Sequence, residues 1–218
     1  MSFFELVRGP LAWAAFLIFL LGSVYNLYVF FKKAQKDKVL YGYFSLKYTL
    51  RSYLFWLLPL GSYSMRQRPL FTLISYFFHV GLLLTPIFFL GHIELWKESW
   101  GISWWALPNL VSDFLTGLTI ICGLILLARR LLVRDAKYLS TFTDYVFLIL
   151  VILVFLTGFL ARYQILFNYQ VISGIHILLG EIMLVLIPFT KLSHIFYFWL
   201  IRAHTASEFG AVRRSKDY

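Results

Sequence analysis

Two pairs of histidines lie inside apolar segments of the chain. His79 and His92 are 13 residues apart, and His176 and His194 are 18 residues apart. An imidazole ring is costly to place in hydrocarbon, so a histidine within a membrane usually has a ligand or partner that offsets its desolvation. If two antiparallel helices carry these pairs, each histidine of one helix lies beside a histidine of the other. Each such pair could hold a haem iron through one nitrogen of each ring.

The composition determines the class of protein. Of the 218 residues, 61% are hydrophobic, 20% are aromatic and only 14% are charged, and the mean hydropathy is +0.78. These values are typical of an integral membrane protein. The single cysteine, Cys122, excludes both an internal disulfide and a cysteine-ligated iron–sulfur cluster. Any redox cofactor bound by this chain must therefore be held by histidine.

The apolar segments predict an all-α bundle of five transmembrane helices in a single membrane domain, residues 1–218. A bilayer crossing needs about 20 apolar residues. The first segment is too long for a signal-peptide core and runs directly into lysines, so we expect it to be retained. The run at 52–61 is too short to cross and contains Pro59, so we assign 39–69 to a cytoplasmic amphipathic connection. The predicted spans are 10–31, 70–95, 108–132, 143–165 and 174–201.

The basic residues predict the orientation in the membrane. With five crossings, nearly all lysines and arginines outside the spans fall on one side, and only Arg8, Lys97 and Arg162 fall on the other. The positive-inside rule makes the basic side cytoplasmic, which places the N-terminus outside and the C-terminus in the cytoplasm. The net charge of +10 is thus a topology signal. The basic residues are scattered through loops beside the spans, so we do not expect nucleic-acid binding.

This topology pairs His79 with His194 in the cytoplasmic half of the membrane and His92 with His176 in the outer half. On the fifth predicted helix, 18 residues make five complete turns, so both histidines share one face. On the second, 13 residues leave the two side chains roughly 140° apart. Pro86 lies between them, and we expect a proline kink with local unwinding to redirect the outer half.

Four further residues are candidates for the sites. Gly81 and Gly180 lie near the histidines and would leave room for a flat macrocycle, although small residues also serve ordinary helix packing. Lys191 could meet a haem propionate, or extend its ammonium group to the membrane surface. Glu181 lies in the middle of a span and could serve a proton or quinone path, or a hydrogen bond between helices. Zinc and di-iron sites fit less well, because no carboxylate or thiolate accompanies either pair.

Several stretches resemble the respiratory nitrate reductase gamma subunit family. They are FFHVG around His79, LGH at His92, the string IHILLGEIMLVLIPFTKLSHIF from His176 to His194, and ARRLLVRDAKYLSTFTDY. The resemblance covers most of the chain from about residue 70. It implies a five-helix cytochrome b with two b haems, held by His79 with His194 and by His92 with His176. The basic residue that the nitrate reductase branch uses for quinol has no counterpart in WWALPNLVSD, so that quinol site does not carry over.

Other stretches are similar to the membrane subunit of the transmembrane redox complexes of sulfate-reducing bacteria. These are ESWGISWWALPN, the helix-five string and RAHTASEFGAVRRSKDY. This resemblance implies two partners: a cytoplasmic iron–sulfur subunit resembling heterodisulfide reductase and a periplasmic multihaem cytochrome c. It also implies a multi-pass protein of the bacterial inner membrane, in contact with lipid.

The sequence therefore predicts a dihaem cytochrome b that carries electrons across the membrane. The donor at the outer face would be a periplasmic cytochrome c or menaquinol, and the acceptor a cytoplasmic iron–sulfur protein. The chain itself is expected to complete no substrate chemistry, and whether it oxidises quinone is left open. Two alternatives contain no haem: a membrane anchor for a soluble enzyme, and a proton-conducting transporter subunit that uses His79, His92, Glu181 and Lys191.

Overall fold

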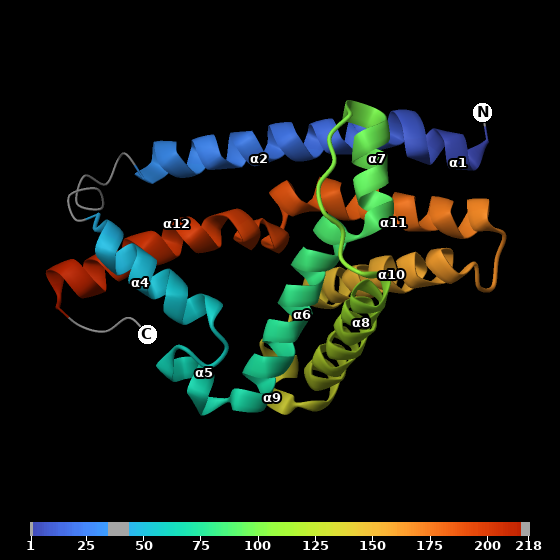
Figure 1. The fold of residues 1–218 in the computed structure, drawn as a ribbon. Helices are drawn as coiled ribbons and strands as arrows, with labels where there is room; N and C mark the ends of the chain where they lie inside the picture. The colour runs from blue at the N-terminus through green and yellow to red at the C-terminus, as the bar shows by residue number, and fades with distance from the viewer. Residues whose placement is uncertain (1, 35–43, 215–218) are drawn as a thin grey trace. The chain divides into compact units, whose positions relative to one another are not determined.

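The computed structural model describes residues 2–34 and 44–214, and all regular secondary structure in these ranges is helical (Figure 1). The prediction of an all-α protein with five spans is confirmed, because five helices in these described ranges are long and apolar enough to cross a membrane. The 46–57 segment is not among them. The orientation of the termini stays a prediction. The five spans are Phe3–Lys33, Pro69–Phe88, Asn109–Leu132, Phe142–Tyr163 and Tyr169–Phe189.

The chain divides into two compact units. The first contains Leu73–Gly180 and the first five residues, and the second contains Leu6–Thr72 and Glu181–Tyr218. Each unit is described by itself below. The assignment of residues 1–218 to a single domain stays a prediction.

The first unit is built on two long neighbouring helices, α8 (Asn109–Leu132) and α10 (Phe142–Tyr163), joined through the short helix α9 (Arg134–Tyr138). A capping box of Thr141 and Asp144 begins α10. Apolar side chains of α10 form much of the buried core, including Val151, Ile152 and Phe155. The Ile152 side chain packs onto the α8 backbone at Gly123, where a β-carbon would lie 2.8 Å from Cγ1 of Ile152.

Helix α6 (Pro69–Phe88) packs on α8 through Gly81. A β-carbon at Gly81 would lie 1.9 Å from Oγ1 of Thr119 and 3.1 Å from the carbonyl oxygen of Leu115. Thr119 is buried, and its hydroxyl donates to that same carbonyl at 2.7 Å. Helix packing therefore accounts for Gly81, and the space expected there for a macrocycle is filled by α8.

The predicted helix 70–95 is interrupted, and the local unwinding expected near Pro86 lies at Phe89. Helix α6 ends at Phe88, Phe89 is extended with φ −75° and ψ 127°, and α7 (Leu90–Trp100) begins one residue later. The break lies three residues beyond Pro86, whose ring lacks the N–H that would continue the helical ladder. Gly101, in the left-handed region with φ 69°, ends α7. His79 and His92 therefore lie on different helices.

The predicted helix 174–201 is interrupted as well. Helix α11 (Tyr169–Phe189) contains Pro188 and ends beside it, Thr190 is extended, and a short 3₁₀ turn (Lys191–Ser193) leads into α12 (His194–Ser207). The argument from five complete turns between His176 and His194 therefore does not hold. The hydroxyl of Thr190 accepts a hydrogen bond from the Leu192 amide at 3.2 Å, which stabilises the start of the turn.

In the second unit, α2 (Ala12–Ala34) packs beside this interruption. A short helix α1 (Phe3–Leu6) and a π-helical turn (Val7–Leu11) precede α2 without a gap. The side-chain amide of Asn26 donates to the carbonyl of Pro188, which is one of the carbonyls that the end of α11 leaves unpaired. A β-carbon at Gly22 would lie 2.9 Å from Cγ of Pro188. The second break is thus held by a neighbouring span.

Helix α4 (Leu46–Leu57) lies along α12 in the same unit (Figure 1). Small polar residues of α4, Thr49 and Ser52, are buried against it. The guanidinium of Arg202 donates to Oγ of Ser52 at 3.0 Å and lies 4.5 Å from the ring centre of Trp56. Helix α5 (Tyr63–Gln67) follows, and the π-helical turn Glu208–Val212 continues α12. The predicted 39–69 connection therefore contains a helix, α4, that packs against α12. Residues 35–43 lie outside the described ranges.

We expect Gly81→Ala to destabilise the protein by about 1–3 kcal/mol, because the new methyl group overlaps Thr119. The measurement is thermal unfolding of the purified protein in detergent. Gly117→Ala on α8 is the matched control, since a β-carbon there meets nothing within 4 Å. The double variant Gly81→Ala/Thr119→Ala should recover part of the loss. Equal stability of the Gly81 and Gly117 variants would contradict the packing described here.

Candidate functional site

His92 of α7 and His176 of α11 come together within the first unit. Their ring centres are 6.0 Å apart, and the ring planes differ by only 3°. Both side chains are half-buried. The sequence predicted that these two histidines share one half of the membrane. The structure brings them together as a pair with parallel ring planes.

The break at Phe89 orients His92. An extended residue at the end of a helix leaves the preceding carbonyls without their intrahelical partners. The carbonyl of Pro86 instead lies 2.8 Å from Nδ1 of His92. A ring nitrogen at a carbonyl must carry the proton, so Nδ1 donates and Nε2 keeps its lone pair. The ring of Phe89 packs edge-on against His92, with 5.4 Å between centres.

A strap of residues 101–108 satisfies the other two carbonyls at the break. The indole nitrogen of Trp104 donates to the carbonyl of Ile87 at 2.9 Å, and the Leu107 amide donates to that of Phe88 at 2.9 Å. The ring of Trp105 stacks on Phe88, with 4.4 Å between centres. A tryptophan-rich stretch beside a span is typical of an aromatic belt at the membrane surface. The contacts give it a further role, because they fix the backbone that holds His92.

His176 is oriented by the backbone of α10. Its Nδ1 lies 3.0 Å from the carbonyl of Val154 and 3.4 Å from the hydroxyl of Thr157. A carbonyl oxygen has two lone pairs, so Val154 can accept this bond beside its helical one. The approach requires Gly158, where a β-carbon would lie 2.9 Å from Cε1 of His176. Here too Nδ1 is the donor nitrogen, and Nε2 is available as a ligand.

The separation of the two ring centres and the small angle between the ring planes are compatible with two imidazoles on one metal ion. Two metal–nitrogen bonds of about 2 Å each, with about 1 Å from each nitrogen to its ring centre, separate the centres of two axial imidazoles by about 6 Å. The His92 and His176 rings have this separation and are parallel. A carbonyl at Nδ1 of a ligating histidine fixes its tautomer and makes Nε2 more basic. Within the described ranges, no three His, Cys, Asp or Glu side chains gather as zinc and di-iron sites require.

The other two histidines show the same backbone contact. Nδ1 of His79 on α6 lies 2.7 Å from the carbonyl of Ser75, and Nδ1 of His194 lies 2.9 Å from that of Lys191. His194 is the first residue of α12, directly after the 3₁₀ turn. These two histidines belong to different units, so their pairing stays a prediction. The contact with His194 also gives the backbone of Lys191 a role that the sequence did not indicate.

The remaining candidates differ in their surroundings. A β-carbon at Gly180 would meet nothing within 4 Å, so its α11 face is open. Both carboxylate oxygens of Glu181 are buried and have no hydrogen-bond partner among the described residues. Whether a macrocycle lies at Gly180 and whether the Lys191 ammonium meets a propionate stay predictions.

Sequence reasoning missed the residues that aim the two rings. Val154, Thr157, Gly158 and Phe89 contact the pair directly, but each lies in an apolar run of ordinary composition. Of the residues near this pair, only Pro86 indicated that a helix would be interrupted. The contact partner of His176 is on another helix, so no spacing along the sequence could identify it.

One comparison with known proteins gives a match. A protein of Nitratidesulfovibrio vulgaris (strain Hildenborough) is 36% identical over 217 residues, which cover 97% of this chain and 95% of that protein. The chain belongs to the same family as that protein. The relative's name states no activity, no family model matches the chain, and no solved structure matches it.

We expect Gly158→Val to displace the His176 ring and to remove the haem that this pair would hold, because even one β-carbon is too close to Cε1. The measurement is the haem-to-protein ratio of the purified protein, which should fall by about half relative to the wild type. Gly117→Val on α8 is a control with open space at the same type of position. Full haem content in the Gly158 variant would contradict the placement of His176.

Proposed function

We propose that this protein is a dihaem cytochrome b that carries electrons across the bacterial inner membrane. The observation that carries the proposal is the parallel His92–His176 pair, with 6.0 Å between ring centres and each Nδ1 engaged by a backbone carbonyl. Further support comes from the same backbone contact at His79 and His194. The relative comes from a sulfate-reducing bacterium, which agrees with the resemblance to the redox complexes of such organisms.

The residues of the chain would bind and position the two groups. In the outer half, His92 and His176 would supply both axial nitrogens, and His79 with His194 would do so in the cytoplasmic half. Each haem would supply a one-electron carrier within hydrocarbon that no side chain can replace. With two imidazoles per iron, no coordination position is left for substrate, so we assign the chain electron transfer alone. The donor would be menaquinol or a periplasmic multihaem cytochrome c.

A haem-free anchor and a proton-conducting transporter are the competing functions. The buried Glu181, with no partner for either oxygen among the described residues, is the observation that favours proton transfer. A carboxyl group in that position is costly to ionise, which is why such groups within a membrane often mark a proton path. A pyridine haemochrome assay on the purified protein separates the functions, because both alternatives predict a protein that contains no haem. Haem reduction by menaquinol or by reduced cytochrome c in the intact complex would then identify the donor.

The α4–α12 helix pair carries the docking face that we propose for the cytoplasmic iron–sulfur subunit. Leu46, Leu50 and Leu54 form a stripe on α4 at intervals of four residues, and their side chains are 62%, 53% and 64% exposed. The opposite side of α4 is occupied by α12, which begins with His194. A partner on the leucine stripe would thus lie on the helix that packs against α12, which would carry a ligand of the cytoplasmic-side haem.

We expect His92→Ala and His176→Ala to remove the same redox component, and His79→Ala and His194→Ala to remove the other, because each pair shares one iron. The measurement is an optical redox titration of each variant, beside its haem content. His204→Ala is the control, since that histidine is outside both pairs and should leave two components. If His92→Ala and His176→Ala remove different components, the pairing is wrong.

We expect the triple variant Leu46→Ser/Leu50→Ser/Leu54→Ser to release the iron–sulfur subunit during purification while both haems stay bound. Tyr138→Ser/Leu139→Ser is the matched control. These two exposed apolar residues lie on the predicted cytoplasmic side of the membrane but outside the α4–α12 pair. Their variant should keep the subunit. If the triple variant keeps the complex intact, the leucine stripe contacts lipid and the docking face lies elsewhere.

A further inference from the structure

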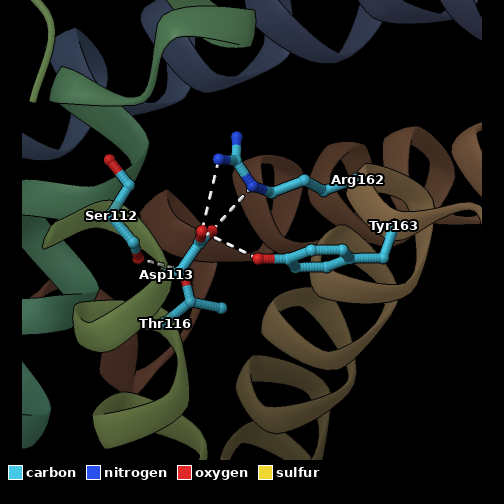
Figure 2. A network of polar contacts seen from close by, with 5 residues as sticks. All are labelled: Ser112, Asp113, Thr116, Arg162 and Tyr163. Carbon is cyan, nitrogen blue, oxygen red and sulfur yellow. Dashed lines mark hydrogen bonds and ion pairs between the residues drawn. The ribbon is translucent and has the colours of Figure 1, made fainter. Parts of the chain in front are cut away.

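A polar cluster, separate from the histidine pair, joins the ends of two spans in the first unit (Figure 2). Asp113 is in the first turns of α8, and Arg162 and Tyr163 are in the last turn of α10. Nε of Arg162 lies 2.7 Å from Oδ1 of Asp113, and Nη2 lies 3.3 Å from Oδ2. The Tyr163 hydroxyl donates to the same Oδ2 at 2.9 Å. Asp113 therefore accepts bonds from both sides, and the guanidinium is held in one orientation.

The cluster is buried enough for its charges to act over a distance. The side chains of Arg162 and Asp113 are only 22% and 20% exposed. Exposed ion pairs are screened by water and salt, whereas a largely buried pair in a low-dielectric surrounding is screened much less. An ion pair next to a redox group therefore has a field that the redox group experiences.

Arg162 leads directly to the histidine pair. Its guanidinium carbon lies 5.3 Å from the ring centre of Phe89, and the Phe89 ring centre lies 5.4 Å from that of His92. These two contacts place the guanidinium within about 11 Å of the His92 ring. Phe89 is also the extended residue at the break that orients His92. The positive charge of the cluster is thus fixed on the wall of the outer site.

We propose that Arg162 and Asp113 set the reduction potential of the outer haem, with Arg162 raising it and Asp113 lowering it. The inference rests on the proposed function, because it needs a haem at His92 and His176. Reduction adds one electron to the iron, from the ferric to the ferrous state. A fixed positive charge favours the added electron, and a fixed negative charge opposes it. The two residues are positioning residues, since neither is a ligand of the iron.

The size of the effect follows from Coulomb's law. A unit charge within about 11 Å of the His92 ring, at an effective dielectric constant of about 20, would change the reduction equilibrium of an iron held there by roughly tenfold. For a one-electron couple, a tenfold change corresponds to a shift of about 59 mV. Such a shift is large enough to be resolved in an equilibrium titration, and the other haem component of the same sample is an internal reference.

The test is a potentiometric titration of the purified protein with both haems bound. The outer component is identified as the one that His92→Ala removes. Arg162→Gln should lower the equilibrium constant for reduction of this component about tenfold, and with it the reduction potential. Asp113→Asn should raise both. The double variant Arg162→Gln/Asp113→Asn should lie between the single variants, and Arg162→Lys, which keeps the charge, should stay close to the wild type. The other component should shift less in every variant.

An exposed charge pair of α7 gives the matched control. Nζ of Lys97 lies 3.5 Å from Oε2 of Glu94, and the side chains are 58% and 49% exposed. Because solvent screens both charges, Lys97→Gln and Glu94→Gln should move the outer potential much less than the buried substitutions. Shifts as large as those of the Arg162 and Asp113 variants would overturn the inference.

A merely structural role gives a different result. If the cluster only joins α8 to α10, Arg162→Gln and Asp113→Asn break the same contact and should shift the potential in the same direction, or not at all. Either result overturns the inference, as does loss of the outer haem in the Arg162→Lys variant. If the wild-type protein binds no haem, the proposed function itself fails. Two haems in the wild type with no opposite shifts leave the proposed function standing and remove only this inference.

Discussion

Backbone carbonyls released at helix breaks are the constraint on which the candidate site depends. In hydrocarbon there is no water to satisfy a polar backbone group, so each carbonyl freed within a membrane protein must find an internal donor. At the break between α6 and α7, the three carbonyls of Pro86, Ile87 and Phe88 bond to His92, Trp104 and Leu107 respectively. The histidine ring is thus one of the donors that makes the break tolerable. The same bond fixes its tautomer, so the interaction that satisfies the backbone also leaves the Nε2 lone pair of this candidate ligand available.

The partner ring is prepared in a different way. His176 donates to a carbonyl inside an unbroken helix, and glycine at position 158 lets the ring approach that backbone. One ring is thus aimed by a break and the other by a close helix contact. The separation of the rings depends on how α7, α10 and α11 pack together. Around this pair, Phe89 connects the histidine to a largely buried ion pair between α8 and α10, which brings a fixed charge close to the site.

The second unit repeats the combination of a helix break with a histidine. Helix α11 ends after Pro188, Asn26 of α2 takes up the freed Pro188 carbonyl, and His194 begins the next helix with Nδ1 at the Lys191 carbonyl. Beyond that point α12 continues as a partner of α4, through buried small polar residues and a guanidinium stacked on Trp56. The leucine stripe of α4 faces away from this contact. The α4–α12 pair therefore carries a candidate ligand on α12 and, on α4, the surface that we propose for a partner.

Much of the fold could be predicted from the sequence because hydrophobicity in a membrane protein is a local property. Each apolar run of about 20 residues is long enough to cross a bilayer by itself, so the five spans and the exclusion of 46–57 follow from the chain alone. The four histidines also stand out by residue type, because an imidazole in an apolar run needs a physical reason. The grouping of His92 with His176 followed from an alternating topology. Pro86 indicated that a helix would be interrupted, but not that Phe89 would be the extended residue.

The aim of each ring was decided only by tertiary structure. Two helices predicted as continuous are broken, and the periodicity used to place histidines on one face does not extend across a break. The Val154 carbonyl, Gly158 and the Asp113–Arg162 pair act between helices that are distant in sequence, and no pattern along one helix encodes which neighbour it meets. The sequence by itself determined which residues could bind iron and how many spans carry them. The packing of the spans decided which carbonyl holds each ring, because that contact exists only when two helices come together.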